Sequence, residues 1–506
     1  MTGIRRALLW STADKYFNLV VNFASLAIIS RLLTPEEIGV SAVGTAIIAF
    51  ALALREFAST GFLIQHRSLT RRDVQTSFTI LFALTFIIAA ALVALSPWMA
   101  AFFGEPNLSR FVGVLSVAIV IETIGLPITA LLRREMAFGR LAAINISVAA
   151  VCAPLSIVLA AIGFSYMSTA WAWLAATTMT TVLSLCIRPD FWIFRPSLRA
   201  WRSVLAFGTF GGANTVLIWL NETLPQLVLG RILPLGVVGL YNRALLICSM
   251  PDKVVLNGVS SVATPALAAE VRHGRCIKQA YLQSLGFITV IHWPALIVLL
   301  LLAGPVVEIV LGSQWLTIVP VVQLLAIASL FRFPSILTSS VLIAVGAVNL
   351  TLRASLISLP ISALVLCLAS PFGVVAMAAT QLVTVPFQTL VAIHFIRRHV
   401  PFGWRELVAA LRQSAFVTAC SAAGPAVVIA LGGFRFDLSL SEALAAVLIS
   451  AAGWLLGIWL AQHPALAELQ RILRLAAENA VGQRLISGIL RRPGRRGAVN
   501  TADLNL

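Results

Sequence analysis

Charged residues are scarce in this sequence. Asp, Glu, Lys and Arg make up 11% of its 506 residues, whereas soluble globular domains carry about 25%. Hydrophobic residues make up 59%, and the mean hydropathy is +0.97. A soluble protein of this length could not bury so much apolar surface. We therefore expect an all-α polytopic membrane protein, in which each span needs about 20 apolar residues.

Motifs for catalysis and for metal or disulfide chemistry are also missing. The sequence has no G-x-x-x-x-G-K-[ST] loop for nucleotide hydrolysis, no H-E-x-x-H and no G-x-S-x-G. Its six cysteines form no C-x-x-C pair, so neither a zinc site nor a disulfide framework is indicated. The loops that we expect outside the membrane are short. We expect no enzyme, no cofactor and no metal site.

Long apolar runs are what the sequence does contain. Runs of about 18 residues or more predict about fourteen membrane spans. They lie near 12–31, 38–62, 78–102, 111–132, 141–162, 166–187, 204–232, 237–260, 281–303, 319–343, 350–369, 373–396, 413–433 and 441–461.

The basic residues test this number of spans, because Lys and Arg resist crossing the membrane during insertion. With the N-terminus in the cytoplasm, 29 of the 36 Lys and Arg residues fall in or beside cytoplasmic loops and tails. Both termini are thus predicted to be cytoplasmic. The net charge of +17 reflects topology and contact with anionic lipids rather than nucleic-acid binding.

The chain contains an internal repeat. Residues 31–40 and 231–240 share the pattern R-[LI]-L-x4-[IV]-G at an offset of 200, and Phe103-Gly104 and Leu311-Gly312 match at an offset of 208. The repeat predicts two pseudo-symmetric six-span lobes of the same orientation, related by an axis along the membrane normal. We expect one lobe at 1–200, the second at 201–398, two added spans within 399–464, and a basic amphipathic cytoplasmic tail at 465–506.

The repeated turn also carries a resemblance to a known family. The runs from Arg31 to Gly39, from Leu227 to Ala244 and from Leu311 to Pro320 resemble the polysaccharide-transporter branch of the MOP exporter superfamily. Members of that branch are flippases for lipid-linked oligosaccharides. Many of them carry an acidic residue followed by Leu-Leu or Leu-Ile in span 7, where this chain has Asn221-Glu222-Thr223. The coupling ion, H+ or Na+, is therefore left open.

The resemblance implies an alternating-access transporter in the bacterial inner membrane. Its cargo would be a polyprenyl-diphosphate-linked oligosaccharide for exopolysaccharide or O-antigen synthesis. Since no ATPase motif is present, transport would be driven by an ion gradient or by downstream consumption of the product. Other polysaccharide-assembly membrane proteins are the expected protein partners.

Polar side chains share one face of span 1. They recur at helical spacing and are Ser11, Asp14, Asn18, Asn22 and Ser25. At the offset of 200, Asp14 matches Asn214 in span 7, and Asn22 matches Glu222. Spans 1 and 7 are thus predicted to line a central cavity; the alternative is hydrogen bonding between helices without a cavity.

Charged residues within other spans complete the candidate site. A charge at mid-membrane costs about 2.5–3.5 kcal/mol on insertion scales, so each needs a partner or a watery cavity. The residues are Arg55, Glu56, Glu122, Arg243 and Arg332. Arginine suits a diphosphate because its planar fork matches phosphate oxygens.

Purely structural pairs are the alternative to this cavity. Arg55 could pair with Glu56 or with a neighbouring helix, and Glu222 with Arg243. His292, in span 9, is either a packed residue or a proton relay, and packing is the commoner case.

Three other functions stay open from the sequence. A peptidoglycan-precursor flippase could use spans 13 and 14 to shelter a lipid tail. A cation-coupled multidrug exporter would have a more acidic cavity with fewer arginines. A membrane glycosyltransferase or polymerase would need a large outer loop, which is absent.

Overall fold

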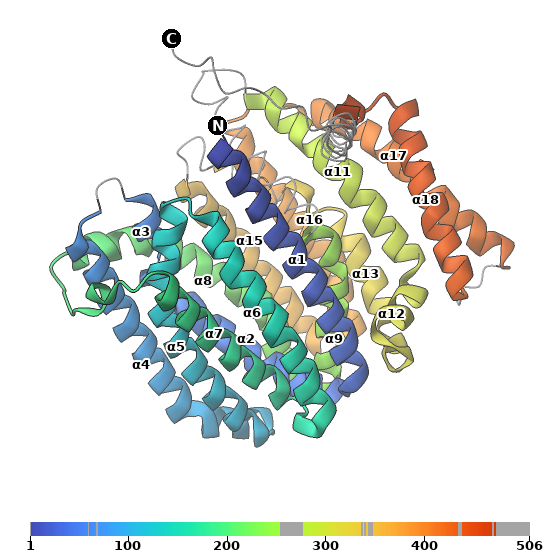
Figure 1. Cartoon of the computed structure of the whole chain (residues 1–506). Helices are drawn as coiled ribbons and strands as arrows, with labels where there is room; N and C mark the ends of the chain where they lie inside the picture. The colour runs from blue at the N-terminus through green and yellow to red at the C-terminus, as the bar shows by residue number, and fades with distance from the viewer. Residues whose placement is uncertain are drawn as a thin grey trace, which may run out of the picture.

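The computed structural model describes residues 2–58, 60–66, 69–253, 277–334, 337, 341–342, 348–433, 438–467 and 470–471. Within these ranges the chain is helical and contains no strand. The helices of the first half are α1 (Thr2–Leu32), α2 (Pro35–Arg55), η1 (Glu56–Ala58), α3 (Gly61–Gln65), α4 (Arg71–Phe103), α5 (Asn107–Arg134), α6 (Phe138–Leu159), η2 (Ala160–Phe164), α7 (Met167–Ile187) and η3 (Phe191–Phe194). Figure 1 shows the arrangement of the whole chain.

The second half begins with the long helix α8. Its helices are α8 (Trp201–Ile232), α9 (Leu235–Cys248), α11 (Ile277–Leu301), α12 (Ala303–Leu311), η4 (Ser313–Ile318), α13 (Val319–Ser329), α15 (Val348–Ala369), η5 (Ser370–Phe372) and α16 (Val374–Arg397). Two more helices follow, α17 (Trp404–Leu431) and α18 (Leu440–Leu460).

Local chemistry explains where several helices begin. Thr34, Thr70 and Ser439 each accept a hydrogen bond from the backbone three residues on, and an acidic side chain at that position bonds back to the cap. These capping boxes satisfy backbone N–H groups that a helix start leaves free. Gly104 ends α4 with a φ of 70°, a conformation that suits glycine.

Ten helices of the described residues are long and apolar enough to cross a membrane. Helices α1 and α8 have the length but are not among these ten, and α9 and α13 are shorter within the described ranges. Each predicted span coincides at least partly with a described helix. The all-helical, multi-pass fold is confirmed, while the number fourteen stays a prediction.

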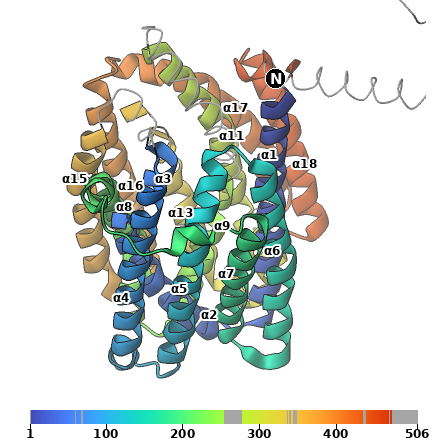
Figure 2. The same cartoon turned by 60° about the vertical axis from the view of Figure 1, so that its left-hand side comes forward.

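Helices pack within each half in an order that differs from their order in the sequence. In the first half, α4, α5, α7, α6 and α1 pack in succession, and Figure 2 shows α4 to α7 side by side. In the second half, α8, α9, α13, α15 and α16 pack together, and α17 and α18 are added against α11. The division at 200, 398 and 464 remains a prediction, and most of the tail from 465 lies outside the described residues.

The hydrophobic cores differ between the two ends of the helices. At the end predicted to face outside, one large cluster joins both halves; Val43 and Phe111 pack in it with Tyr241 and Trp315. At the predicted inner end the halves have separate cores, one around Phe78 and Ile128, the other around Tyr281, Ile393 and Phe402 in its own cluster. The large shared core therefore lies toward the predicted outer end. At the predicted inner end the halves meet through α8, whose Val204 joins the first of the two smaller cores and whose Gly208 would place an added Cβ 2.0 Å from the backbone oxygen of Phe57.

Candidate functional site

The predicted polar face of α1 borders a hollow of about 600 Å³, which α6 and α7 line from the other side. Asp14 accepts a hydrogen bond from Asn18 at 2.7 Å on the same helix. It accepts another from Asn145 of α6 at 2.8 Å. Asn22 also lines this hollow. The face thus bonds to a neighbouring helix and borders a hollow within the first half. A cavity lined jointly by spans 1 and 7 stays a prediction, because no residue of α8 lines this hollow.

A second hollow, of about 680 Å³, lies between α1 and the end of α9. Lys15, Asn18 and Asn22 line it from the first half. Leu246, Met250 and Lys253 line it from the second half. Lys15 and Lys253 are two of the three lysines in the sequence, so one cation from each half borders the same space.

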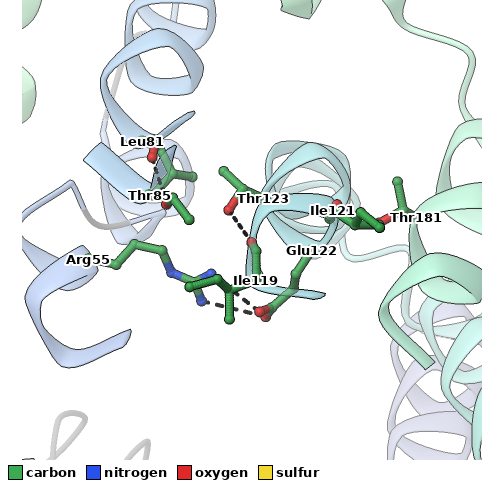
Figure 3. Close-up of polar contacts among 8 residues, drawn as sticks. All are labelled: Arg55, Leu81, Thr85, Ile119, Ile121, Glu122, Thr123 and Thr181. Atoms are coloured by element: carbon green, nitrogen blue, oxygen red, sulfur yellow. Dashed lines mark hydrogen bonds and ion pairs between the residues drawn. The ribbon is translucent and has the colours of Figure 1, made fainter. Parts of the chain in front are cut away.

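Arg55 and Glu122 form an ion pair between α2 and α5, and Figure 3 shows their side chains pointing at each other. The Nη1 atom of Arg55 lies 3.3 Å from Oε2 of Glu122, and the Arg55 side chain is 10% exposed. Thr181 of α7 donates to the backbone oxygen of Ile121 at 3.0 Å beside the pair. Arg55 therefore takes its partner from a neighbouring helix and not from Glu56.

The second half contains a matching pair with the charges reversed. Nη1 of Arg332 lies 3.7 Å from Oδ2 of Asp252, and Nε2 of His292 lies 2.5 Å from Oδ1 of the same carboxylate. At the repeat offset of 200, Arg55 is equivalent to position 255, and at the offset of 208, Glu122 is equivalent to position 330. Asp252 and Arg332 thus lie within one helical turn of the equivalent positions.

The other predicted residues are more dispersed. Glu56 begins η1 and forms no ion pair among the described residues. Asn221 and Glu222 lie on α8, and the charge of Arg332 acts on Glu222. Arg243 is 8% exposed in α9, and its buried Nε has no hydrogen-bond partner among the described residues. The alternative pair of Glu222 with Arg243 is not formed.

The repeated turns meet at the predicted outer end and seal it. A Cβ added to Gly39 would lie 1.9 Å from the backbone oxygen of Leu235, and one added to Gly239 would lie 2.0 Å from that of Pro35. The ends of α2 and α9 can approach this closely because neither glycine has a side chain.

Hydrogen bonds from the second half reinforce this seal. The side-chain amide of Gln314 donates to the Ser30 oxygen at 2.6 Å, and the indole of Trp315 donates to the same oxygen at 2.8 Å. Arg31 in turn donates to the backbone oxygen of Ile309. With the joined core, these contacts describe a molecule closed at its predicted outer end.

Three further charged residues, Lys15, Asp252 and Lys253, are not among the predicted site residues. Lys15 and Lys253 each lie near a predicted cytoplasmic boundary, where basic residues are explained by membrane topology alone, and Asp252 lies within a predicted span. A signal for Asp252 is present, because Pro251-Asp252-Lys253 interrupts the apolar run predicted at 237–260. No group of three or more possible metal ligands occurs among the described residues.

Comparison with known proteins places the chain among membrane transporters. Residues 28–320 match a family described as polysaccharide biosynthesis protein. The lipopolysaccharide biosynthesis protein WzxC of Escherichia coli (strain K12) is 25% identical over 348 residues, or 68% of this chain and 70% of that protein. The succinoglycan biosynthesis transport protein ExoT of Rhizobium meliloti (strain 1021) is 26% identical over 332 residues, or 64% of this chain and 66% of that protein.

Solved structures show the same fold. The lipid II flippase MurJ, in an inward closed conformation, superposes with a TM-score of 0.70 at 12% identity, covering 89% of this chain and 98% of that one. An inward-facing multidrug resistance MATE family transporter of the MOP superfamily superposes with a TM-score of 0.62 at 15% identity, covering 76% and 94%. At such identities the likeness concerns the fold alone. The neighbours are transporters and not enzymes, as the sequence predicts.

Proposed function

This chain belongs to the polysaccharide biosynthesis protein family, and on that premise we propose that it is a flippase for polyprenyl-diphosphate-linked oligosaccharides. It would move these units across the bacterial inner membrane, for exopolysaccharide or O-antigen synthesis, by alternating access. Both termini would lie in the cytoplasm. The transport and lipopolysaccharide relatives support the cargo class.

The hollow between α1 and α9 is the observation that carries the proposal. Lys15 and Lys253 border it from opposite halves of the molecule, so a diphosphate placed there would meet cations from both. The halves are joined beyond this hollow at the predicted outer end, so with both termini in the cytoplasm, as proposed, the hollow would lie on the cytoplasmic side of the closed end. A lipid-linked substrate made in the cytoplasm would therefore meet the protein in a receptive state.

Two functions on the same fold remain as alternatives. A peptidoglycan-precursor flippase would also bind a polyprenyl diphosphate. The likeness to MurJ supports this alternative only through the shared fold. A multidrug exporter of organic cations is less compatible with this hollow, because two ammonium groups would repel such a drug. The candidate coupling ions are H+ and Na+, and anionic membrane lipids and other polysaccharide-assembly proteins are the proposed partners.

The proposal is tested in the native host by finding which leaflet holds the lipid-linked glycan. A non-permeant glycan-modifying enzyme is applied to spheroplasts and to inverted vesicles. With the gene deleted, or with Lys15→Gln and Lys253→Gln combined, we expect the glycan to accumulate on the cytoplasmic face and surface polysaccharide to fall several-fold.

Matched variants separate charge from fold in this experiment. Lys278→Gln removes the third lysine and should leave the glycan distribution unchanged. Lys278 lies at the start of α11, and its Nζ is 2.5 Å from Oε1 of Glu406 on α17. Lys15→Arg and Lys253→Arg keep the charge and should retain most of the flipping. A normal glycan distribution in the deletion strain, with altered drug sensitivity, would contradict the flippase and favour the exporter.

A further inference from the structure

The carboxylate of Asp252 has two neighbours that can carry positive charge. His292 is fully buried and lies 2.5 Å away, while Arg332, whose side chain is 51% exposed, lies at 3.7 Å. The reversed pair in the first half, Arg55 with Glu122, has no histidine beside it among the described residues. The second half therefore holds an ion pair to which a proton can be added.

The unoccupied nitrogen of His292 shows where that proton would be bound. When Nε2–H donates to Asp252, the lone pair of the neutral ring is on Nδ1. Nδ1 is buried and has no hydrogen-bond partner among the described residues. A proton added at Nδ1 converts the ring to an imidazolium, which keeps its bond to the Asp252 carboxylate.

The charges of the cluster follow from this protonation. With a neutral ring, Asp252 and Arg332 balance each other, and Arg332 is held by the carboxylate. With the imidazolium, His292 balances Asp252 instead, and Arg332 keeps an uncompensated positive charge. Because Arg332 is half exposed, that charge is accessible to an anion.

We propose that His292 and Asp252 form a proton site that controls whether Arg332 is available to an anionic ligand, so that a proton and the diphosphate bind cooperatively. By linkage, each must raise the affinity for the other by the same factor. The proton then accompanies the diphosphate and offsets part of the charge that crosses the membrane. This inference rests on the proposed function, because the ligand is taken to be a diphosphate.

Few other charged or titratable groups surround the cluster among the described residues. On α9, the Cys248 thiol interacts electrostatically with both Asp252 and Arg332. On α8, Glu222 interacts electrostatically with Arg332. From α16, Thr389 donates a hydrogen bond to the backbone oxygen of Phe331. Lys253 follows Asp252 but borders the hollow beside α1.

The remaining neighbours of α11 contribute a second histidine farther away. A Cβ on Gly286 would lie 3.7 Å from Nε2 of His463, and Gly286 precedes His292 by more than one helical turn. The backbone N–H of Ala465 donates to Nδ1 of His463, and no carboxylate contacts this ring among the described residues. Burial also lowers the pKa of His463, so this neutral imidazole is a suitable control.

The test measures proton uptake on binding of farnesyl diphosphate to the full-length protein in nanodiscs. Calorimetric titrations in buffers of different ionisation enthalpy give the number of protons taken up per ligand. We expect wild type to take up close to one proton more than His292→Gln. We also expect its affinity to fall about tenfold or more from acidic to basic pH beyond the change in His292→Gln. The ligand's own titration is common to both proteins and cancels.

Two substitutions are expected to shift the affinity in opposite directions. Asp252→Asn removes the group that competes for Arg332, so binding should be tight at every pH and carry no proton uptake by the protein. His292→Gln leaves Arg332 paired, so binding should be weak at every pH. Arg332→Gln, on a half-exposed side chain, should fold normally, bind weakly and abolish the extra proton. His463→Gln should behave as wild type.

Two results would overturn the inference while leaving the flippase standing: equal proton uptake by wild type and His292→Gln, or weakened binding in both Asp252→Asn and His292→Gln. Failure of wild type to bind farnesyl diphosphate at any pH would instead contradict the proposed function and the coupling with it.

Discussion

At the scale of single residues, the arginines within the membrane have different environments. Arg55 is held by Glu122, Arg332 pairs with Asp252 but is half exposed, and Arg243 is buried without a partner for its Nε among the described residues. A buried ion pair adds little net stability, but removal of one partner leaves a charge that has lost both water and its counter-charge. Pairing thus explains how Arg55 and Arg332 are accommodated within predicted spans.

Substitution of Arg55 alone should destabilise the protein. Arg55→Met leaves the Glu122 carboxylate without its partner, and we expect the free energy of unfolding to fall by about 1–3 kcal/mol. The double variant Arg55→Met with Glu122→Leu should recover most of this loss, since apolar side chains replace both charges. Thermal unfolding in nanodiscs measures both effects. Arg140→Met, at an exposed arginine with no ion pair among the described residues, is the control.

A double variant as unstable as Arg55→Met would show that the two charges do not compensate each other. A stable double variant that has lost transport would instead assign the pair a role in binding the substrate.

At the scale of helices, the two repeated turns form the contact that closes the molecule. Gly39 and Gly239 occupy equivalent positions in the repeat, and each allows the backbone of the other half to approach. Cores tolerate added volume poorly, and overpacking costs about 1–3 kcal/mol. A side chain at either position must therefore move α2 and α9 apart.

Gly239→Ala should weaken the outer seal. Its Cβ would lie 2.0 Å from the Pro35 oxygen, a backbone atom that can move only with its helix. We expect Cys248, which is 4% exposed in α9, to react several-fold faster with a membrane-impermeant thiol reagent applied from outside. Mass spectrometry of the labelled peptides measures the reaction at this cysteine.

Gly113→Ala is the matched control, because nothing lies within 4 Å of its added Cβ. It should leave the reactivity of Cys248 unchanged. Equal reactivity in Gly239→Ala and wild type would contradict the assignment of this contact as the seal.

At the scale of the whole molecule, the two halves share one large core at the predicted outer end, whereas at the predicted inner end α8 packs against η1 and α4 of the first half. The joined core and the hydrogen bonds of Gln314 and Trp315 hold the halves together at the predicted outer end. Helix α8 also packs along α2, η1 and α4, whereas the hollow with Lys15 and Lys253 lies on the side of α1. An outward-open state therefore requires the contacts between α1 and the segment 309–315 to break.

A covalent link across this seal should stop transport reversibly. Arg31 donates to the Ile309 backbone oxygen, and both residues are exposed, so cysteines at these positions are accessible to a short bifunctional thiol reagent. We expect Arg31→Cys with Ile309→Cys to lose most flipping after bridging with a disulfide-forming reagent and to regain it on reduction. Each single variant, treated alike, should remain active. Unchanged flipping in the bridged protein would show that these helices do not separate during the cycle.

The sequence by itself determined the class of the molecule. Its apolar runs and scarce charge establish a helical membrane protein, because a lipid environment requires each backbone to satisfy its own hydrogen bonds. The runs from Arg31 to Gly39, from Leu227 to Ala244 and from Leu311 to Pro320 predict the family, which the match over residues 28–320 confirms. The polar face of α1 was also predicted, because helical periodicity alone places Asp14, Asn18 and Asn22 together.

Only the tertiary structure decided which charges are paired and which end is closed. The Asp252 carboxylate contacts His292 and Arg332, which follow it in the sequence by 40 and 80 residues. Periodicity within one helix carries no information about contacts between residues so far apart in the chain. In the sequence, membrane topology alone explains Lys15 and Lys253. The positive-inside rule counts basic residues near the ends of spans and does not say which face of a helix they occupy. Their meeting across one hollow depends on how the two halves pack, which is set by side-chain volumes distributed over both.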